Sequence, residues 1–288
     1  MKYIPLMLGL MLPVLSACDA PAGDSQTTQT TVTTQTTEPA AQSGSQAAPA
    51  TPAPEAAAPA ATSACMETIK KDGLRVITSP DYPPYEFTNE NNEIVGYEID
   101  LVKLLASKMG VEPKIEGQGF EGLIPSLLAG RADMIAAGMS VTEERKKSVA
   151  FSDSYNNTKN VIIAPTSSAD IKDSASLNGR TVAVQSGSLQ EVIAQGIEGA
   201  QVKSFGLATD AVMAVKTGQA ESMIVDEEVA SGVVKSYPEL HVAAELGAEQ
   251  TAFAVNPNCG ELVTALNTAL QTVQQSGELE TLKSQWFK

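Results

Sequence analysis

Short apolar runs alternate with longer segments whose apolar residues recur every three or four positions through residues 66–288. The run at 74–78 predicts a strand, and 98–109 predicts a helix that ends at Gly110, because its apolar residues fall on one face. The same patterns predict further strands at 114–116, 134–136, 161–164, 181–184, 202–205, 223–225 and 252–255. Further helices are predicted at 122–128, 142–147, 189–194, 208–217, 228–235, 259–275 and 278–286. This alternation indicates an α/β architecture with a largely parallel sheet.

Residues 1–17 have the pattern of a secretory signal peptide. Lys2 supplies a positive start, and the apolar run at 4–15, which Pro5 and Pro13 interrupt, is too short to span a bilayer. The sequence Leu-Ser-Ala-Cys at 15–18 resembles the lipobox of bacterial lipoproteins, which implies cleavage before Cys18 and lipidation of its thiol. The alternative is an ordinary signal peptide in which Cys18 has no role.

Residues 18–65 are expected to form the lipidated cysteine and a tether. From 19 to 64 the chain is rich in Thr, Gln, Ala, Pro and Ser, with no aromatic residue, no Lys or Arg and four acidic residues. Such a composition offers too little apolar surface to offset the entropy of ordering, which predicts disorder. The folded part is therefore expected to begin at residue 66.

Composition and charge argue against several classes of function. The chain has 34 acidic and 19 basic residues, and its formal charge of −15 repels a phosphate backbone. One histidine and three scattered cysteines cannot build a zinc site without help from carboxylates. The sequence also lacks the glycine-rich nucleotide motifs and the Gly-x-Ser-x-Gly nucleophile motif. We therefore expect no nucleic acid, no metal and no cofactor.

Seven motifs stand in one order between residues 70 and 288. They are Gly-Leu-Arg-Val at 73–76, Tyr-Pro-Pro-Tyr-Glu-Phe at 82–87, Gly-Tyr-Glu-Ile-Asp-Leu at 96–101, Phe-Glu-Gly-Leu-Ile-Pro at 120–125, Gly-Met-Ser-Val-Thr-Glu-Glu-Arg at 138–145, Phe-Ser-Asp at 151–153 and Trp-Phe at 286–287. In this order they resemble the bacterial extracytoplasmic solute-binding proteins of the polar amino-acid type (family 3), which are the receptors of ABC importers.

The resemblance implies a two-lobed periplasmic-binding-protein fold, or flytrap, with a mostly parallel sheet in each lobe and two crossing hinge strands. It assigns 66–158 and 252–288 to lobe I and 159–251 to lobe II, with crossings near 160–164 and 250–254. It also implies a receptor rather than an enzyme. Such a receptor binds a free amino acid as a monomer and delivers it to an ABC permease, from a lipid anchor on the extracytoplasmic side of the cell membrane.

By the same resemblance, Arg145 is expected to bind the α-carboxylate of the ligand, with Gly138 and Ser140 beside it. A guanidinium group matches a carboxylate in a bidentate fork, and Arg145 stands near the start of a predicted helix, where backbone N–H groups favour anions. Asp226 corresponds to the aspartate that binds the α-ammonium group. The alternatives are an exposed helix arginine beside two lysines and an aspartate that only caps a helix.

A turn in the second lobe contains Gln185, Ser188 and Leu189 and opens a helix. The resemblance carries over Ser188 and the amide of Leu189 as the other half of the carboxylate clamp. Tyr82 and Phe120 match the aromatic residues that enclose the ligand side chain, and ordinary core packing is their alternative role.

A neutral polar amino acid, such as glutamine or cystine, is the expected ligand. Several relatives that bind basic amino acids have an acid where Ser79 stands, and Gln185 offers only neutral hydrogen bonds. The pocket lining implied by the resemblance therefore offers no spare charge for the ligand side chain.

Cys65 and Cys259 are predicted to form a disulfide, because the resemblance assigns both segments to lobe I and the compartment is oxidising. Free thiols are the alternative. Three other functions stay open. They are a sensor that acts through a partner, a purely structural lipoprotein, and an enzyme like the cyclohexadienyl dehydratases of the same fold, with Glu86 and Asp226 as candidate acids.

Overall fold

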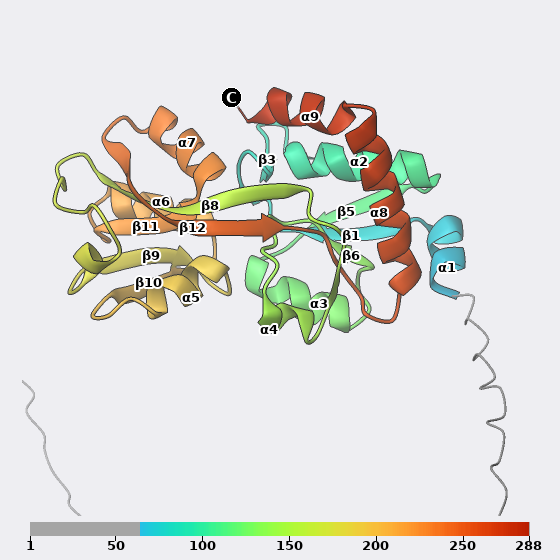
Figure 1. The fold of residues 1–288 in the computed structure, drawn as a ribbon, viewed down its shortest axis with the longest axis horizontal. Helices are drawn as coiled ribbons and strands as arrows, with labels where there is room; N and C mark the ends of the chain where they lie inside the picture. The colour runs from blue at the N-terminus through green and yellow to red at the C-terminus, as the bar shows by residue number, and fades with distance from the viewer. Residues whose placement is uncertain (1–63, 288) are drawn as a thin grey trace, which may run out of the picture. The chain divides into compact units, whose positions relative to one another are not determined.

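The computed structural model describes residues 64–287, which form two α/β lobes, each built on a five-stranded sheet (Figure 1). The first sheet, in the order β5-β1-β6-β13-β7, comprises β1 (Leu74–Thr78), β5 (Pro113–Gly117), β6 (Met134–Ile135), β7 (Ala150–Phe151) and β13 (Ala254–Val255). The second, in the order β10-β9-β11-β8-β12, comprises β8 (Asn156–Pro165), β9 (Thr181–Gln185), β10 (Gln201–Phe205), β11 (Ser222–Asp226) and β12 (Leu240–Thr251). The two-lobed α/β fold predicted from the sequence is therefore present.

Each sheet is mixed rather than mostly parallel. In the first sheet β1 pairs in parallel with β5 and β6, whereas β13 pairs antiparallel with β6 and β7. In the second sheet β9 pairs in parallel with β10 and β11, whereas β8 pairs antiparallel with β11 and β12. Strands joined by helical crossovers run in parallel, and the strands on which the chain passes between the lobes run against them.

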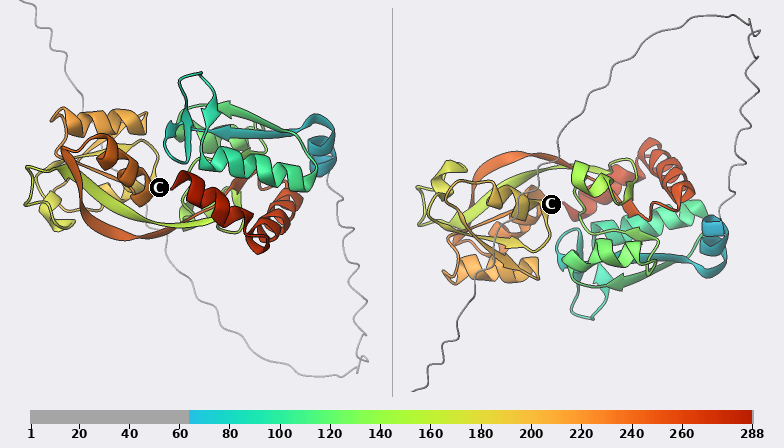
Figure 2. Two further views of the ribbon diagram at one scale, coloured as in Figure 1. Left: turned by 90° about the horizontal axis from the view of Figure 1, so that it is seen from above. Right: turned by 90° about the horizontal axis from the view of Figure 1, so that it is seen from below.

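Helices cover both faces of the first sheet (Figures 1 and 2). One side has α1 (Ala64–Asp72), α2 (Tyr97–Met109), α8 (Gly260–Gln275) and α9 (Glu278–Trp286), and the other has the single turn η1 (Phe120–Gly122), α3 (Leu123–Leu128) and α4 (Glu143–Lys146). Val76 packs in the cluster of α2 and α8, whereas its neighbour Ile77 packs with Leu123 and Leu127 of α3. Successive side chains of a strand point to opposite faces, so the apolar run at 74–78 supplies both cores.

The second sheet is covered in the same way by α5 (Leu189–Gln195) on one face and by α6 (Ala208–Lys216) and α7 (Glu227–Ser236) on the other (Figure 2). Ile162 and Ile224 pack with Ala194 of α5, while their neighbours Ile163 and Met223 belong to the cluster that contains the α6 and α7 side chains. Strands buried on both faces read as continuous apolar runs, which is why the sequence predicts them well.

The chain crosses between the lobes on the two longest strands, β8 and β12, which lie side by side (Figure 1). Their antiparallel register runs from Asn156 opposite Thr251 to Pro165 opposite Leu240, with two irregularities in β12. Most of β12 is absent from the predicted elements, because its polar and apolar residues do not alternate regularly. Its pairing with β8 supplies the order that the local pattern lacks.

A small antiparallel sheet of β2 (Asp81–Tyr82), β3 (Glu86–Thr88) and β4 (Ile94–Val95) follows β1. Gly96, which follows β4, has φ 135°, and a Cβ atom there would lie 2.2 Å from the carbonyl oxygen of Tyr85. Only glycine therefore allows this close approach of two backbones. The sheet presents β2 toward the second lobe.

A disulfide joins Cys65 of α1 to Cys259 before α8, with Cα atoms 5.9 Å apart. Helix α1 was not among the predicted elements, and it begins at Ala64, inside the segment predicted as tether. Its buried residue Ile69 packs in the core of the first lobe, which explains why an otherwise polar segment is ordered there. Cys18 and the rest of residues 1–63 lie outside the described part.

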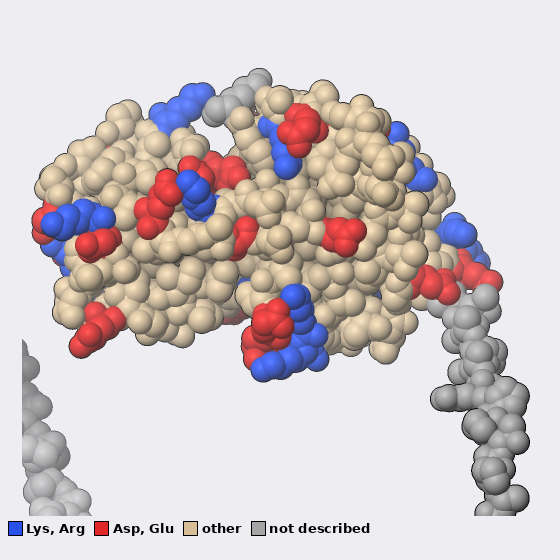
Figure 3. Space-filling view, in the orientation of Figure 1, with Lys and Arg blue, Asp and Glu red and all other residues tan. Residues whose placement is uncertain are grey.

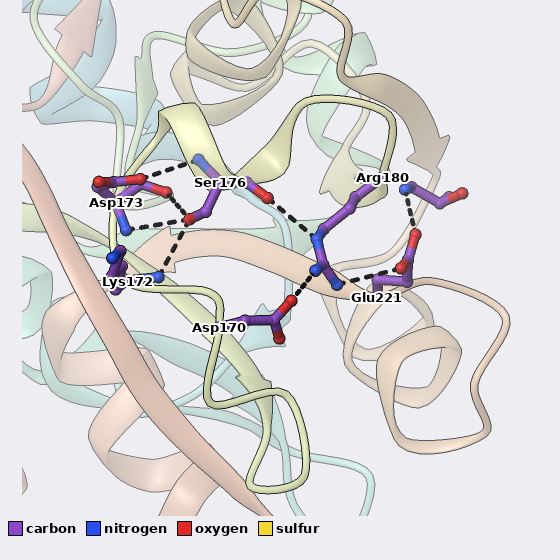
Figure 4. A network of polar contacts seen from close by, with 7 residues as sticks. Asp170, Lys172, Asp173, Ser176, Arg180 and Glu221 are labelled. Carbon is purple, nitrogen blue, oxygen red and sulfur yellow. Dashed lines mark hydrogen bonds and ion pairs between the residues drawn. The ribbon is translucent and has the colours of Figure 1, made fainter.

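Arg180 holds the segment before β9, which contains the single turn η2 (Ala175–Leu177), against β11 (Figure 4). Its guanidinium donates to the carbonyl oxygen of Ser176 at 3.0 Å, and it pairs with the carboxylates of Asp170 and Glu221. Glu221 also accepts from the backbone N–H of Thr181 at 3.0 Å.

Through residues 64–287, no helix is long and apolar enough to cross a membrane.

Candidate functional site

On the short helix α4, the side chain of Arg145 has surroundings different from those of its charged neighbours. The hydroxyl of Thr142 accepts from the N–H of Arg145 at 3.1 Å and caps the helix. Over α4 the surface shows charges of both signs (Figure 3), where Lys146 pairs with Glu143 at 2.8 Å and Lys147 pairs with Glu144. Arg145 takes no part in these exposed pairs. It is half-buried and directed to the interior, so the alternative of an exposed helix arginine does not apply.

The guanidinium of Arg145 reaches from the first lobe to the second. It donates to the carbonyl oxygen of Ser140 at 2.8 Å and to that of Gly187, before α5, at 3.1 Å. It also lies 5.6 Å from the ring centre of Phe120. Burial lowers the pKa of Arg145, and the carboxylate of Glu249 partly opposes this shift. Both acceptors are neutral carbonyl groups, which leaves the positive charge without a direct ion pair.

The turn after β6 carries Gly138 and Ser140. Gly138 has φ 53°, and a Cβ atom there would lie 3.4 Å from the ring of Tyr82, so the turn packs against that ring. Its N–H donates to Glu98 at 2.8 Å. Ser140 forms an isolated bridge with Thr251 at the end of β12, which fixes the turn to the crossing strands.

A chain of buried polar side chains runs from this turn into the second lobe. The Ser140 hydroxyl donates to Glu249 Oε1 at 3.0 Å, and Asn160 Nδ2 donates to Glu249 Oε2 at 2.9 Å. Gln190 Nε2 then donates both to Asn160 Oδ1 at 2.9 Å and to Asp226 Oδ1 at 2.7 Å. All five side chains are at least nine-tenths buried. We call this set, Ser140, Glu249, Asn160, Gln190 and Asp226, the buried polar chain.

The two carboxyl groups of the buried polar chain, those of Asp226 and Glu249, influence each other's pKa. Burial raises the pKa of Asp226 well above its ordinary value, and the neighbouring carboxylates of Glu249 and Glu228 raise it further. Burial also raises the pKa of Glu249, which the hydrogen bonds from Asn160 and Ser140 oppose. Asp226 makes no side-chain capping bond to α7, so its carboxyl group is available for another role. A cationic group beside the pair would stabilise its ionised form.

Asp81 of β2 joins the lobes at a second point. Its carboxylate accepts from the Ser79 hydroxyl at 2.7 Å, from Gln185 Nε2 at 3.1 Å and from the backbone N–H of Ala208 at the start of α6. Leu207, at the N-cap position of α6, has no side chain that could cap this helix, so Asp81 caps it from the opposite lobe. Burial raises the pKa of Asp81, and these hydrogen bonds oppose the shift.

The two predicted aromatic residues lie against the predicted polar ones. The Tyr82 hydroxyl accepts from the backbone N–H of Asp226 at 3.3 Å, and Phe120 lies beneath the Arg145 guanidinium. Tyr82 also stacks on Tyr85, with ring centres 6.0 Å apart. Tyr85 itself is fully buried in the core of the first lobe. Tyr82 is therefore the member of the pair that faces the second lobe.

In the turn before α5, the hydroxyl of Ser188 already has hydrogen-bond partners within its own lobe. Ser188 caps α5 by accepting from the N–H of Glu191 at 3.1 Å, and its hydroxyl donates to the carbonyl oxygen of Gln185 at 2.7 Å. Leu189 is half-buried at the first position of the helix. The structure thus brings nine of the ten predicted residues into contacts where the lobes meet: Ser79, Tyr82, Phe120, Gly138, Ser140, Arg145, Gln185, Ser188 and Asp226. The tenth, Leu189, follows Ser188 in the sequence as the first residue of α5.

Two cavities adjoin Asp81. One of about 540 Å³ is also lined by Ser79 and Gln118, and one of about 650 Å³ is also lined by Glu228 and Phe287. Arg145 and Asp226 line neither of them. The lobes touch directly across the predicted site, since Arg145 and Asp81 both bond to residues of the second lobe. Among the described residues there is no group of three His, Cys, Asp or Glu side chains that could hold a metal ion.

Residues 74–288 match the family model for bacterial extracellular solute-binding proteins, family 3. The chain belongs to this family. The solute-binding protein is 35% identical over 223 residues to the arginine-binding extracellular protein ArtP of Bacillus subtilis (strain 168), covering 75% of this chain and 87% of ArtP. It is 32% identical over 217 residues to the ABC transporter arginine-binding protein 1 of Escherichia coli (strain K12), covering 73% and 88%.

Solved structures agree with the fold of this solute-binding protein. A variant of ArgBP from T. maritima superposes with a TM-score of 0.75 at 39% sequence identity, covering 77% of this chain and 98% of that chain. The resemblance found in the seven sequence motifs is therefore confirmed, and so is the two-lobed fold.

Several site residues of the solute-binding protein were not identified from the sequence. Asp81, Gln190 and Glu249 bond directly to predicted residues, and Glu98 accepts from the N–H of Gly138. Asn160 bonds to Gln190 and Glu249. What distinguishes them is that each is a polar residue buried within a strand or a helix, and burial cannot be read from the sequence. Glu86, the candidate acid of the enzymatic alternative, is fully buried in the first lobe, and neither of its carboxyl oxygens has a partner there.

Proposed function

We propose that this solute-binding protein binds a free amino acid between its lobes and delivers it to an ABC importer. Arg145 carries the proposal, because its half-buried guanidinium joins the two lobes without an ion pair and adjoins the Ser140 end of the buried polar chain. A zwitterion needs a cation for its carboxylate and an anion for its ammonium group. Arg145 and Asp226 offer these two charges on opposite lobes.

The ligand that the charges favour has a cationic side chain. Three carboxyl groups of the site are buried, those of Asp81, Asp226 and Glu249, and no Lys or Arg side chain of the described residues is buried to the same degree. An additional positive charge on the ligand therefore reduces the cost of burying carboxylates. The names of the relatives above, which bind arginine, support the same ligand.

Asp81 is the reason to prefer arginine to the neutral amino acids expected from the sequence. That expectation rested on Gln185, which is neutral, and on Ser79, where an acid was missing. The Asp81 carboxylate is 2.7 Å from the Ser79 hydroxyl, so an acid from another position lies directly beside Ser79. Guanidinium offers five N–H donors in a planar fork, which suits a carboxylate at the end of a cleft. Glutamine and cystine stay as the neutral candidates in the test.

A ligand screen by thermal unfolding tests the proposal. Ligand that binds only the folded protein at 100 times its Kd adds about 2.7 kcal/mol, which for this size raises Tm by roughly 5 to 10 °C. Protein first unfolded and refolded to remove carried ligand is expected to respond most to L-arginine, less to glutamine and cystine, and least to glutamate. No shift with any amino acid contradicts amino-acid binding, and a largest shift with glutamine contradicts only the cationic ligand.

The variant Asp81→Asn separates the side-chain site from the rest. It keeps the shape of the side chain but removes its charge, so we expect the affinity for arginine to fall at least about tenfold more than that for glutamine. Asp72→Asn, at the exposed end of α1, is the matched control and leaves both affinities unchanged. Equal losses for the two ligands would show that Asp81 only holds the lobes together.

Three features of the receptor remain proposals of the same kind. We place lobe I at 66–158 and 252–288 and lobe II at 159–251, with one boundary inside the crossing strand β8 and the other at the end of β12. We infer that the protein acts without catalysing a reaction, since the enclosed position of Glu86 does not suit a cleft acid. We also infer a lipid anchor at Cys18, from the lipobox alone.

A further inference from the structure

Glu249 of the crossing strand β12 lies between the two charges of the proposed site. It accepts from Ser140, whose carbonyl oxygen binds Arg145, and it is connected through Asn160 and Gln190 to Asp226. Its side chain is directed inward, with 8% of the residue exposed. Glu245 on the same strand is exposed and pairs with Lys159 at 2.8 Å. One acid of β12 is thus paired with a lysine at the surface, and the other is enclosed among polar side chains.

Neither carboxyl group of the buried polar chain has a cationic partner within the described residues. The donors to Glu249 are a hydroxyl and an amide, and the side-chain donor to Asp226 is an amide. No ion pair of the described part includes Glu249 or Asp226. Arg145 influences Glu249 electrostatically but gives its hydrogen bonds to carbonyl groups. A cation beside these two carboxyl groups would stabilise them in the ionised form.

The topology explains why these two acids lie together. Strand β8 lies between β11 and β12, and Asn160 of β8 is in register with Asp226 on one side and Gly247 on the other. The side chain of Asn160 therefore bonds to Glu249 on one side and, through Gln190, to Asp226 on the other. This arrangement holds two carboxyl groups around one position, next to the hydroxyl of Ser140.

We propose that Glu249 is a further ligand-contact residue, which shares the α-ammonium group of the bound amino acid with Asp226. The proposal rests on the proposed function and adds a residue to it. An ammonium group has three N–H donors, so one aspartate leaves donors to be satisfied. A second carboxylate on the crossing strand supplies an acceptor and completes the charge of the site. It also makes the contact depend on the strands that connect the lobes.

The test compares a ligand with its analogue that lacks only the α-ammonium group. Isothermal titration calorimetry measures Kd for L-arginine and for 5-guanidinopentanoate with the wild type and with Glu249→Gln. Glutamine retains the size of the side chain and an acceptor, and removes the charge. We expect Glu249→Gln to weaken arginine binding about tenfold or more and to change binding of the analogue less than about threefold. The preference for the ammonium group therefore falls.

Glu245→Gln is the matched control, because it changes the same residue type on the same strand at an exposed position. We expect it to leave both Kd values unchanged. If Glu249→Gln does not fold, Glu249→Asp makes the same comparison, since it keeps the charge but withdraws it from the ligand by one methylene group.

Each outcome bears either on amino-acid binding by the protein or on the role of Glu249. A wild type that binds no amino acid contradicts the proposed function. A wild type that binds glutamine but not arginine leaves the inference to be tested with glutamine and glutaramate, its analogue without the ammonium group. If the variant weakens amino acid and analogue equally, or weakens neither, Glu249 does not contact the ammonium group and the inference is overturned.

Discussion

The stability of the first lobe is expected to depend on pH through Glu98, the acid behind the Gly138 turn. Glu98 is fully buried, and its Oε1 accepts from the N–H of Gly138 at 2.8 Å and from the hydroxyl of Tyr155. Its Oε2 has no partner. Burial raises the pKa of Glu98 from 4.5 to about 7, against the opposing effect of the two hydrogen bonds. The variant Glu98→Gln keeps an acceptor and cannot titrate.

The expected size follows from the two pKa values. A folded pKa above the unfolded one means that the folded protein binds the proton more tightly. The resulting stability is fully present below pH 4.5 and is lost as the pH rises through about 7. At about 1.36 kcal/mol for each pH unit, a rise of about 2.5 units corresponds to about 3 kcal/mol, of which about 2 to 3 kcal/mol falls between pH 5 and pH 8.

Urea unfolding at pH 5, 6, 7 and 8 measures this effect. Other buried acids, including Glu86 and Asp226, also have raised pKa values, so the wild type alone reports their sum. The difference between the wild type and Glu98→Gln reports Glu98 together with its effect on the pKa of Glu86, and it should shift by about 2 to 3 kcal/mol in favour of the variant from pH 5 to pH 8. Glu116→Gln, at an exposed position of β5, is the control. A difference that is the same at pH 5 and pH 8 would refute the reasoning.

Two further predictions concern the ligand clamp and the disulfide. Arg145→Ala should weaken binding of the amino acid at least about a hundredfold, because it removes the partner of the ligand's buried α-carboxylate. Titration calorimetry measures the change, with the exposed Arg131→Ala as the control. A change below threefold would contradict the role of Arg145. Replacing Cys65 and Cys259 by alanine opens a loop of 194 residues and should lower the free energy of unfolding by about 5 kcal/mol, measured in urea. A loss below about 1 kcal/mol would contradict that estimate.

The helices and the buried strands of both lobes could be predicted because their signals are local. Helix 98–109 was predicted from one apolar face and from Gly110, and α2 runs from Tyr97 to Met109 with Gly110 in the left-handed conformation. The apolar runs at 74–78 and 181–184 correspond to β1 and β9 for the same reason, since burial on both faces leaves few polar residues in a strand.

Elements that depend on a distant partner were not predicted. Helix α1 follows a segment of low complexity, and what orders it is the burial of Ile69 and the disulfide to Cys259. Strand β12 has an irregular pattern, and its length is set by its pairing with β8. Local propensity is a weak prior, and tertiary contacts override it at these positions.

For the site, the sequence by itself determined the chemical groups, and the tertiary structure decided which of them meet. The family resemblance assigned Arg145 and Asp226 to the site, but nothing in the sequence places Glu249 beside Ser140, 109 residues earlier in the chain. Nor does anything in it bring Asp81 to the start of α6, 127 residues later, where it caps the helix from the opposite lobe. These contacts exist only when the crossing strands pair and the lobes touch, because a buried carboxyl group takes its partners from whatever the fold encloses with it.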